Sequence, residues 1–261
     1  MAILITGSSS GIGESLAFQA AQRKHNLVLV ARRKEKLDQI AEKLTSEFGI
    51  EVEVIAADLT DSKGIKLVEK RILDGGIDIL INNAGFGSSG PFVELEVANE
   101  LNEIDLNVRA LVQLSHAAAK TMLEKNLGTI VNISSIASYM PMTGNAVYGA
   151  TKAFVTSFSH ALREELGESG INVMVVCPGM TETEFFERSN WEGANKESPY
   201  PHFLWQTSGQ VAKLVFSGID KQRTVVVPGF ANKLAAAFGS SLPGSVTRKM
   251  TAFVAKGRRL R

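Results

Sequence analysis

The chain has 261 residues, of which 44% are hydrophobic, and its formal net charge is +1. This length is compatible with one α/β domain over residues 1–261, and no apolar run approaches the ~18 residues that a membrane-spanning helix needs. The single cysteine, Cys177, excludes an internal disulfide and is typical of a reducing, cytoplasmic compartment, and the four scattered histidines lack metal-ligand spacing.

Short apolar runs alternate with helical patterns along the chain. Their near-continuous hydrophobicity is typical of strands that are buried on both faces, as in a parallel sheet covered by helices. The predicted strands are 2–6, 27–31, 52–56, 77–81, 129–133, 173–177 and 225–227. We therefore predict a single-domain α/β fold, a Rossmann-like, doubly wound parallel sheet of about seven strands with helices on both faces. Ligands of such a sheet bind at the carboxyl ends of its strands.

The first predicted strand runs directly into a glycine-rich turn, Gly7-Ser-Ser-Ser-Gly11-Ile-Gly13, and then into a helical pattern over 14–23. Glycines in such a turn let the backbone approach a pyrophosphate, whose charge is stabilised by the helix N-terminus. The spacing differs from the common G-x-G-x-x-G fingerprint, and a plain structural turn is the alternative. The position between a first strand and a helix favours a nucleotide site.

The second predicted strand ends without an acidic residue and continues into Arg32 and Arg33. An acid at this place would bond the ribose 2′-hydroxyl of NAD and repel a 2′-phosphate, whereas a guanidinium binds phosphate through two charge-assisted hydrogen bonds. The alternative is that both arginines simply begin a solvated helix. The sequence therefore predicts NADP(H) as the cofactor.

Tyr148 and Lys152 are four residues apart in a predicted helix over 146–166, so they share one helical face. A phenol has a pKa of about 10, and a positive charge within ~4–6 Å can lower a pKa by about 1–3 units. Ser135, thirteen residues before Tyr148, could hold a carbonyl oxygen beside it. A Tyr–Lys pair at this spacing is also a common accident on helices, but it predicts a tuned proton donor.

Two segments depart from the alternating pattern. Residues 180–208 form a long insertion with six aromatic residues, and such insertions are usually lids or binding loops. These aromatics either line an apolar substrate chamber or pack the loop onto the body.

Residues 229–261 are a basic, helical C-terminal extension in which Val246, Met250, Phe253 and Val254 fall on one face. This face packs on the body or on another subunit, or it makes peripheral contact with an anionic membrane. Without a motif or interleaved aromatics, no nucleic-acid partner is expected.

An ordered set of motifs runs through the chain: Thr6-Gly7-x3-Gly11-Ile12-Gly13, Asn82-Asn83-Ala84-Gly85, Asn107, Ser135, Tyr148-x3-Lys152 and Pro178-Gly179. This set resembles the short-chain dehydrogenase/reductase family, in its single-domain branch with an Asn-Ser-Tyr-Lys tetrad, over about residues 2–229.

The resemblance implies an NADPH-dependent oxidoreductase that interconverts a carbonyl and an alcohol of a small, apolar molecule. Tyr148 would be the general acid and base, while Lys152 would lower its pKa and bond the nicotinamide ribose. Ser135, preferred over Ser134 and Ser138 by its interval to the tyrosine, would stabilise the oxyanion, and Asn107 would hold a water that links the lysine to solvent. A non-catalytic NADP-binding regulator is the alternative. The family also implies a homodimer or homotetramer.

The resemblance further implies the contacts of the cofactor. Arg32 matches the arginine of NADP-preferring relatives, and Arg33 or Ser10 would complete the 2′-phosphate pocket. Thr181 stands where the family usually has Val or Ile, at a contact made through the backbone. The full expected set is Gly7, Ser9, Ser10, Gly11, Ile12, Gly13, Arg32, Arg33, Asp58, Leu59, Asn83, Ala84, Gly85, Tyr148, Lys152, Pro178, Gly179, Thr181 and Thr183. Asp58 and Leu59 would lie against the adenine, the Asn83–Gly85 backbone beside the ribose, and the residues after 177 against the carboxamide and pyrophosphate.

Overall fold

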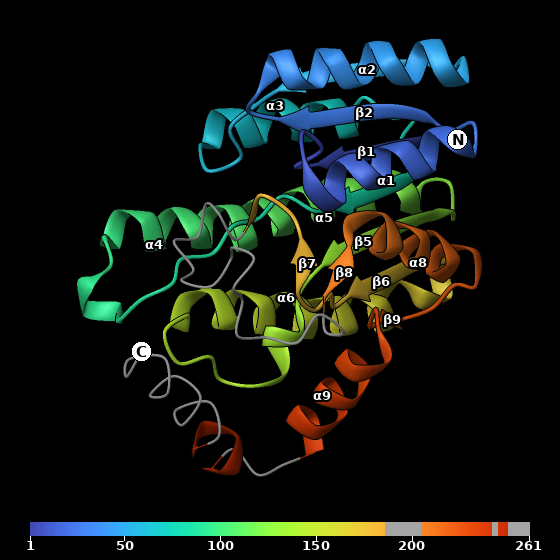
Figure 1. Ribbon diagram of the computed structural model, residues 1–261. Helices are drawn as coiled ribbons and strands as arrows, with labels where there is room; N and C mark the ends of the chain where they lie inside the picture. Colours follow the sequence, from blue (N-terminus) through green and yellow to red (C-terminus); the bar gives the residue numbers. More distant parts are fainter. Residues whose placement is uncertain (186–204, 242–244, 250–261) are drawn as a thin grey trace.

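The computed structural model of the chain describes residues 1–185, 205–241 and 245–249 (Figure 1). The strands of its main sheet are β1 (Ala2–Thr6), β2 (Asn26–Ala31), β3 (Val52–Ala56), β4 (Ile79–Asn82), β5 (Gly128–Ile133), β6 (Ile171–Val176) and β9 (Val225–Val226). The helices are α1 (Gly11–Gln22), α2 (Lys34–Phe48), α3 (Ser62–Leu73), α4 (Val97–Ile104), α5 (Leu111–Leu123), α6 (Ala146–Leu166), α8 (Ser208–Asp220) and α9 (Phe230–Ser241).

The main sheet has the strand order β3-β2-β1-β4-β5-β6-β9, and every pairing within it is parallel. The chain order reverses between β1 and β4, and this topological switch point is the place where such sheets bind ligands. The predicted doubly wound parallel sheet of seven strands is confirmed.

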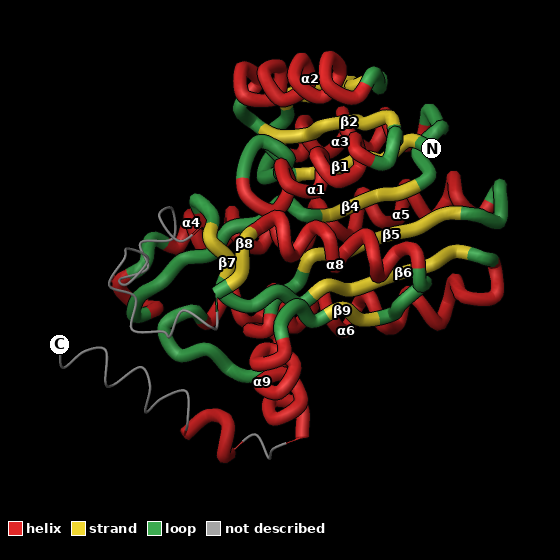
Figure 2. The backbone as a smooth tube through the Cα atoms, turned by 45° about the vertical axis from the view of Figure 1, so that its right-hand side comes forward, coloured by secondary structure: helices red, strands yellow, loops and turns green. Residues whose placement is uncertain are grey.

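Helices cover both faces of the sheet. The helices α1, α2 and α8 pack on one face, and α3, α5 and α6 pack on the other (Figure 2). Within β1, Ile3 and Ile5 pack in the core beneath α1, α2 and α8, and Leu4 packs in the core on the opposite face, beneath α3 and α5. Side chains that alternate along a strand require this arrangement. All three side chains are fully buried. Burial on both faces explains why the strands appear in the sequence as continuous apolar runs.

A helical stretch over residues 97–123 is interrupted by a wider turn. It consists of α4, the π-helical turn η2 (Asp105–Ala110) and α5. Such π-turns are rare in proteins, and those that occur often lie at functional sites. Asn107, a predicted site residue, lies within η2 and is buried there. The apolar spacing of the sequence continues through this region and therefore did not indicate the interruption.

The segment predicted to be an irregular insertion has ordered ends. Its first and last described residues pair as two short parallel strands, β7 (Thr181–Glu182) and β8 (Gln206–Thr207). A capping box of Thr207 and Gln210 then begins α8. Of the six aromatic residues, Phe185 and Trp205 are described, whereas Phe186, Trp191, Tyr200 and Phe203 lie outside the described residues.

The predicted C-terminal extension is described in part. It begins with α9, and residues 245–249 are also helical. Here Val246 is 40% exposed while Thr247 is buried, so this turn does not present Val246 on a buried face. Met250, Phe253 and Val254, the rest of the predicted apolar face, lie outside the described residues. No helix in the described part of the chain is long and apolar enough to cross a membrane.

The doubly covered sheet predicts a large effect of a core substitution. Leu80 in β4 is fully buried, so Leu80→Ala should lower the free energy of unfolding by about 2–5 kcal/mol through the cavity it leaves. The midpoint of thermal unfolding, followed by circular dichroism, should fall by roughly 4–20 °C. Leu67→Ala on α3, where the side chain is 51% exposed, is the control and should change stability by less than about 0.5 kcal/mol. An equal effect of both substitutions would contradict the assignment of the core.

Candidate active site

The glycine-rich turn after β1 is closed to side chains. Gly7 has a φ of 67°, in the left-handed region, and a Cβ added there would lie 2.8 Å from the Cα of Ala84. A Cβ added to Gly13 would collide with the carbonyl oxygen of Gly7. These positions therefore require glycine because the backbone turns back on itself before α1. The turn leaves the N-terminus of α1 facing the carboxyl edge of the sheet, where phosphate is favoured.

Side-chain hydrogen bonds join the ends of β1 and β4 at the switch point. The hydroxyl of Thr6 accepts hydrogen bonds from the backbone N–H of Asn83, at 3.0 Å, and of Ala84, at 2.9 Å. The side-chain amide of Asn83 donates to the carbonyl oxygens of Thr6 and Gly7. Since the Asn83 amide is occupied by the fold, the predicted ribose contact would fall to the backbone of the 83–85 segment.

The structure brings Ser135, Tyr148 and Lys152 together. Ser135 follows β5 at the start of the short helix η3 (Ile136–Tyr139), where its hydroxyl accepts a hydrogen bond from the Ala137 N–H at 3.1 Å and lies close enough to Tyr148 to act on its pKa. Lys152 is buried on α6, its Nζ donates to the carbonyl oxygen of Ile133 at 3.0 Å, and it lies 5.8 Å from the centroid of the Tyr148 ring. The predicted trio therefore occupies one place at the carboxyl edge of the sheet.

The electrostatics of this trio differ from the expectation. Burial, together with the Glu103 carboxylate, raises the pKa of Tyr148 to about 12, and the nearby Ser135 hydroxyl acts in the opposite direction. Burial lowers the pKa of Lys152 to about 8, against the opposing charge of Glu103. The predicted lowering of the Tyr148 pKa is therefore corrected: desolvation of the phenolate outweighs any help from the lysine. Tyr148 therefore keeps its proton at neutral pH.

The neighbouring serines have other partners. The hydroxyl of Ser134 donates to the carbonyl oxygen of Lys152 at 2.8 Å and shares a hydrogen bond with Thr156, so it fastens α6 to β5. The hydroxyl of Ser138 donates to the backbone carbonyl of Ser135 at 2.7 Å. Ser135 thus has the position that the sequence assigned to it beside the tyrosine.

Asn107 connects the helix α4–η2 to the segment after β4. Its Nδ2 donates to the carbonyl oxygen of Phe86 at 2.9 Å and to the hydroxyl of Thr151 at 3.1 Å, while its Oδ1 accepts from the Phe86 N–H. A Cβ added to Gly85 would lie 2.9 Å from Asn107 Oδ1 and 3.3 Å from Lys152 Nζ. Asn107 therefore lies beside the lysine, and its predicted role in holding a water stays a prediction.

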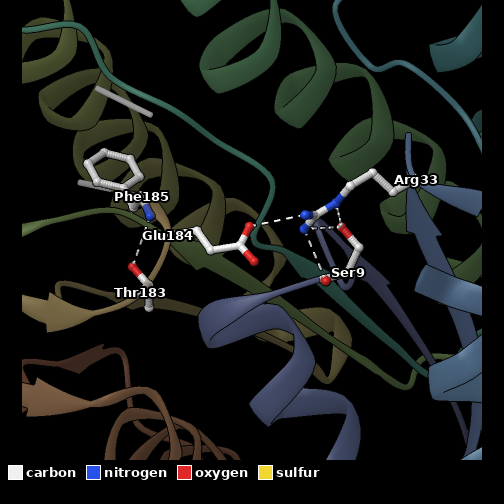
Figure 3. Close-up of polar contacts among 5 residues, drawn as sticks. All are labelled: Ser9, Arg33, Thr183, Glu184 and Phe185. Carbon is white, nitrogen blue, oxygen red and sulfur yellow. Dashed lines mark hydrogen bonds and ion pairs between the residues drawn. The ribbon is translucent and has the colours of Figure 1, made fainter. Parts of the chain in front are cut away.

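The two arginines after β2, Arg32 and Arg33, have different partners. Nε and Nη2 of Arg33 donate to the hydroxyl of Ser9 at 3.2 and 3.1 Å, and its Nη1 forms an ion pair with Glu184 at 3.1 Å (Figure 3). Arg32 is 65% exposed and lies 3.8 Å from Asp58. It is therefore Arg33, and not Arg32, that bonds the glycine-rich turn in this structure. The sequence did not indicate the contact between Glu184 and Arg33, because the two residues are 151 positions apart in the chain.

Asp58 and Leu59 follow β3 at the same edge. Partial burial acts to raise the pKa of Asp58, but hydrogen bonds from the N–H and hydroxyl of Thr60 and the charge of Arg32 outweigh it, so the pKa lies below its ordinary value. Leu59 is buried. Their predicted contacts with an adenine stay predictions.

The segment after β6 closes the other side of this region. The carbonyl oxygen of Pro178 accepts from the Ile136 N–H at 2.9 Å, and Gly179 lies so close to Asn232 that a side chain there would collide with it. Thr181 is buried, and the Thr183 side chain lies about 3.0 Å from where a Cβ of Gly11 would be. Of the residues predicted to hold the carboxamide and pyrophosphate, Thr183 thus meets the glycine-rich turn.

Two features concern ligands near the site. The ring of Phe185 lies 5.5 Å from that of Tyr148, centroid to centroid, and forms an apolar wall beside it. A cavity of about 530 Å³ lies between α8 and α9 and is lined by Trp205, Leu214 and Phe230 among others. None of the tetrad residues lines this cavity, so we do not assign the substrate to it. Among the described residues, no group of three His, Cys, Asp or Glu could hold a metal ion.

Sequence reasoning missed a hydrogen-bonded group behind the site. Oε2 of Glu103, on α4, accepts from the N–H and the hydroxyl of Ser88, and the Ser88 carbonyl accepts from Asn145 at the start of α6. The available signal was the spacing of Glu103 and Asn107, which are four residues apart and so share a helical face.

Comparisons with known proteins agree with this geometry. A family model described as "short chain dehydrogenase" matches residues 1–193. The chain is 35% identical to Sulfoacetaldehyde reductase 2 of Chromohalobacter salexigens over 219 residues, which cover 82% of this chain and 86% of the relative. A short-chain dehydrogenase from Sphingobium yanoikuyae in complex with NADPH superposes with a TM-score of 0.83 at 38% identity, covering 92% of both chains. The bulky-bulky ketone specific alcohol dehydrogenase from Comamonas testosteroni gives a TM-score of 0.78 at 36% identity, covering 93% of this chain and 94% of that chain.

Proposed function

The chain belongs to the short-chain dehydrogenase/reductase family, and we propose that it is an NADPH-dependent oxidoreductase that interconverts a carbonyl and an alcohol, with Tyr148 as general acid and base. The observation that carries the proposal is the position of Ser135 and of the buried Lys152 beside Tyr148. This trio lies at the carboxyl edge of the parallel sheet, where the glycine-rich turn also lies.

The residues at this edge fit a dinucleotide. The glycine-rich turn has no room for side chains, so a pyrophosphate can approach the backbone at the start of α1. Arg33 and Ser9 supply a cation and a hydroxyl for a 2′-phosphate, and Lys152 would bond the nicotinamide ribose. Bound NADPH would supply the hydride.

In the reducing direction, Tyr148 gives its phenolic proton to the carbonyl oxygen of the substrate as the new C–H bond forms at the carbonyl carbon. The product is the alcohol, and Tyr148 is left as a phenolate. The hydroxyl of Ser135 donates to the same oxygen, a stabilisation worth ~3–4 kcal/mol in oxyanion sites. The ammonium of Lys152 stabilises the phenolate until a proton from solvent restores Tyr148. With a pKa of about 8, Lys152 is charged at neutral pH.

The surroundings of Tyr148 support an apolar substrate. The Phe185 ring covers one side of the tyrosine, and Phe185 stands at the start of the 180–208 segment, which we propose closes over substrate. The relatives themselves differ, since one is named for a small charged aldehyde and another for bulky ketones. A panel of aldehydes, ketones, 3-oxoacyl thioesters and steroids, followed by NADPH absorbance, would identify the class.

The setting of the enzyme is also proposed. A cytoplasmic location and a homodimer or homotetramer are expected from the family, and exposed apolar side chains on η1 (Phe92–Glu94) and α4, such as Val93 and Leu101, favour contact with a second subunit. The basic 229–261 segment packs on the protein or contacts an anionic membrane.

Removal of the phenolic hydroxyl tests the reaction. Tyr148→Phe should lower turnover by about 10²–10⁴-fold, because positioned acid–base groups contribute this much, while NADPH affinity stays within a few-fold. Lys152→Ala should lower both turnover and the affinity for NADPH. Tyr139→Phe is the matched control, since the Tyr139 hydroxyl contacts the buried Cys177 thiol, and it should keep activity within about threefold. A Tyr148→Phe enzyme with more than about a tenth of wild-type turnover would rule out the assigned proton donor.

The arginines test the choice of cofactor. We expect kcat/KM for NADPH to exceed that for NADH by one to three decades, equivalent to about 1.4–4 kcal/mol. Ala31→Asp combined with Arg32→Ala and Arg33→Ala should erase or invert this preference, because it removes both guanidinium groups and places an acid beside the 2′-phosphate. Because Glu184 competes with a 2′-phosphate for Arg33, Glu184→Gln should lower KM for NADPH about two- to five-fold and leave NADH unchanged. Glu182→Gln, at an exposed position two residues away, is the control. Equal use of both cofactors by the wild type would contradict the preference.

A further inference from the structure

Two glutamates of α4 are buried behind the active site. Glu103 is fully buried and Glu100 is 3% exposed. The Oε2 of Glu103 accepts from the Ser88 N–H at 3.0 Å and from its hydroxyl at 3.2 Å, but the Oε1 atoms of both glutamates find no hydrogen-bond partner among the described residues. Burial of a carboxylate is costly unless it is paired, so its presence here needs a reason.

The titratable groups that influence Glu103 lie on α6 and on α4 itself. Glu103 lies one helical turn before Asn107, which contacts the residues around Lys152. Its charge acts on Lys152 and Tyr148, both on α6, and Glu100 is its acidic neighbour on α4. Glu103 therefore belongs to the electrostatic environment of Tyr148 and Lys152.

A chain of hydrogen bonds also connects Glu103 to the start of α6. The Ser88 carbonyl oxygen accepts from Asn145 Nδ2 at 2.6 Å, and the Asn145 carbonyl accepts from the Gly149 N–H at 2.9 Å. Asn145 is the N-cap residue of α6, and Tyr148 lies in the first turn of that helix. Movement of the Glu103 carboxylate would thus be passed to the tyrosine.

We propose that Glu103 is a positioning residue of the active site, which keeps Lys152 charged and, through Ser88 and Asn145, holds the first turn of α6 in place. This role presupposes the carbonyl reduction proposed above.

The direction of its electrostatic effect is defined. Burial raises the pKa of Glu103 to about 7, helped by Glu100 and opposed by hydrogen bonds from Ser88 and by the charge of Lys152. Above this pH the carboxylate is ionised and raises the pKa of both Lys152 and Tyr148. Below it the carboxyl is neutral and both effects are lost. A neutral side chain at position 103 should therefore lower the pKa of both Lys152 and Tyr148. This effect should be seen only above about pH 7, where Glu103 of the wild type is ionised.

Glu103→Gln removes the charge and keeps an oxygen that accepts from Ser88. For carbonyl reduction, the alkaline limb of the kcat profile should move to lower pH by roughly half to one unit. The ratio of wild-type to variant kcat should approach one below about pH 6, where Glu103 is neutral. KM for NADPH should stay within about twofold. Glu103→Ala, which also loses the Ser88 contacts, should lower kcat at every pH.

Glu100→Gln is the matched control, because it is buried on the same helix without the Ser88 contacts. It should leave the alkaline limb within about 0.2 unit. A Glu103→Gln profile that superimposes on that of the wild type, or a loss of kcat equal at every pH, would overturn the proposal.

An infrared titration needs no turnover and separates this role from the proposed function. The wild type should show a protonated carboxyl band that disappears with a midpoint near pH 7, and Glu103→Gln should lack it. If Glu103→Gln does not fold, the band that persists in Glu100→Gln identifies Glu103. A midpoint at the ordinary value of 4.5 overturns the proposal. If no carbonyl of the panel is reduced while the band titrates near 7, the proposed function fails and the charge assigned to Glu103 stands.

Discussion

An ammonium group buried at the carboxyl edge of the sheet is the constraint on which the site depends. Lys152 is 5% exposed, and a buried cation is unfavourable unless its partners are in place. The parallel pairing of β5 between β4 and β6 brings the Ile133 carbonyl to 3.0 Å from its Nζ. Gly85 leaves room for the group, and Ser134 fastens the helix at the carbonyl of Lys152 itself. With a pKa of about 8, the lysine is only just charged at neutral pH, so neighbouring charges matter.

The same edge carries the glycine-rich turn at which we propose that a dinucleotide binds. The order of strands places the ends of β1 and β4 side by side, and Thr6 and Asn83 join them. The glycine-rich turn begins at this junction, while Thr183 reaches it from the segment after β6. The proposed proton donor and the proposed nucleotide site are therefore parts of one arrangement.

The sequence predicted those features that depend on local pattern. Apolar runs identified the strands, because burial on both faces leaves no polar alternation, and the resemblance to the short-chain dehydrogenase/reductase family placed Ser135 beside Tyr148. It could not predict features that depend on packing. Glu103 would be expected at the surface from its charge alone, and Glu184 meets Arg33 across 151 residues. The direction of the Tyr148 pKa shift follows from desolvation, which no spacing reveals. The π-turn at 105–110 interrupts a helix whose apolar pattern continues unchanged.

Transfer of an isotope tests the central claim most directly. The enzyme would be given NADPH that carries deuterium at C4 of the nicotinamide, together with a carbonyl substrate from the panel, and the alcohol would be analysed by mass spectrometry and NMR. The account predicts deuterium on the carbinol carbon and a hydroxyl proton that comes from solvent. An alcohol without deuterium at that carbon, or no consumption of NADPH with any carbonyl, would contradict it.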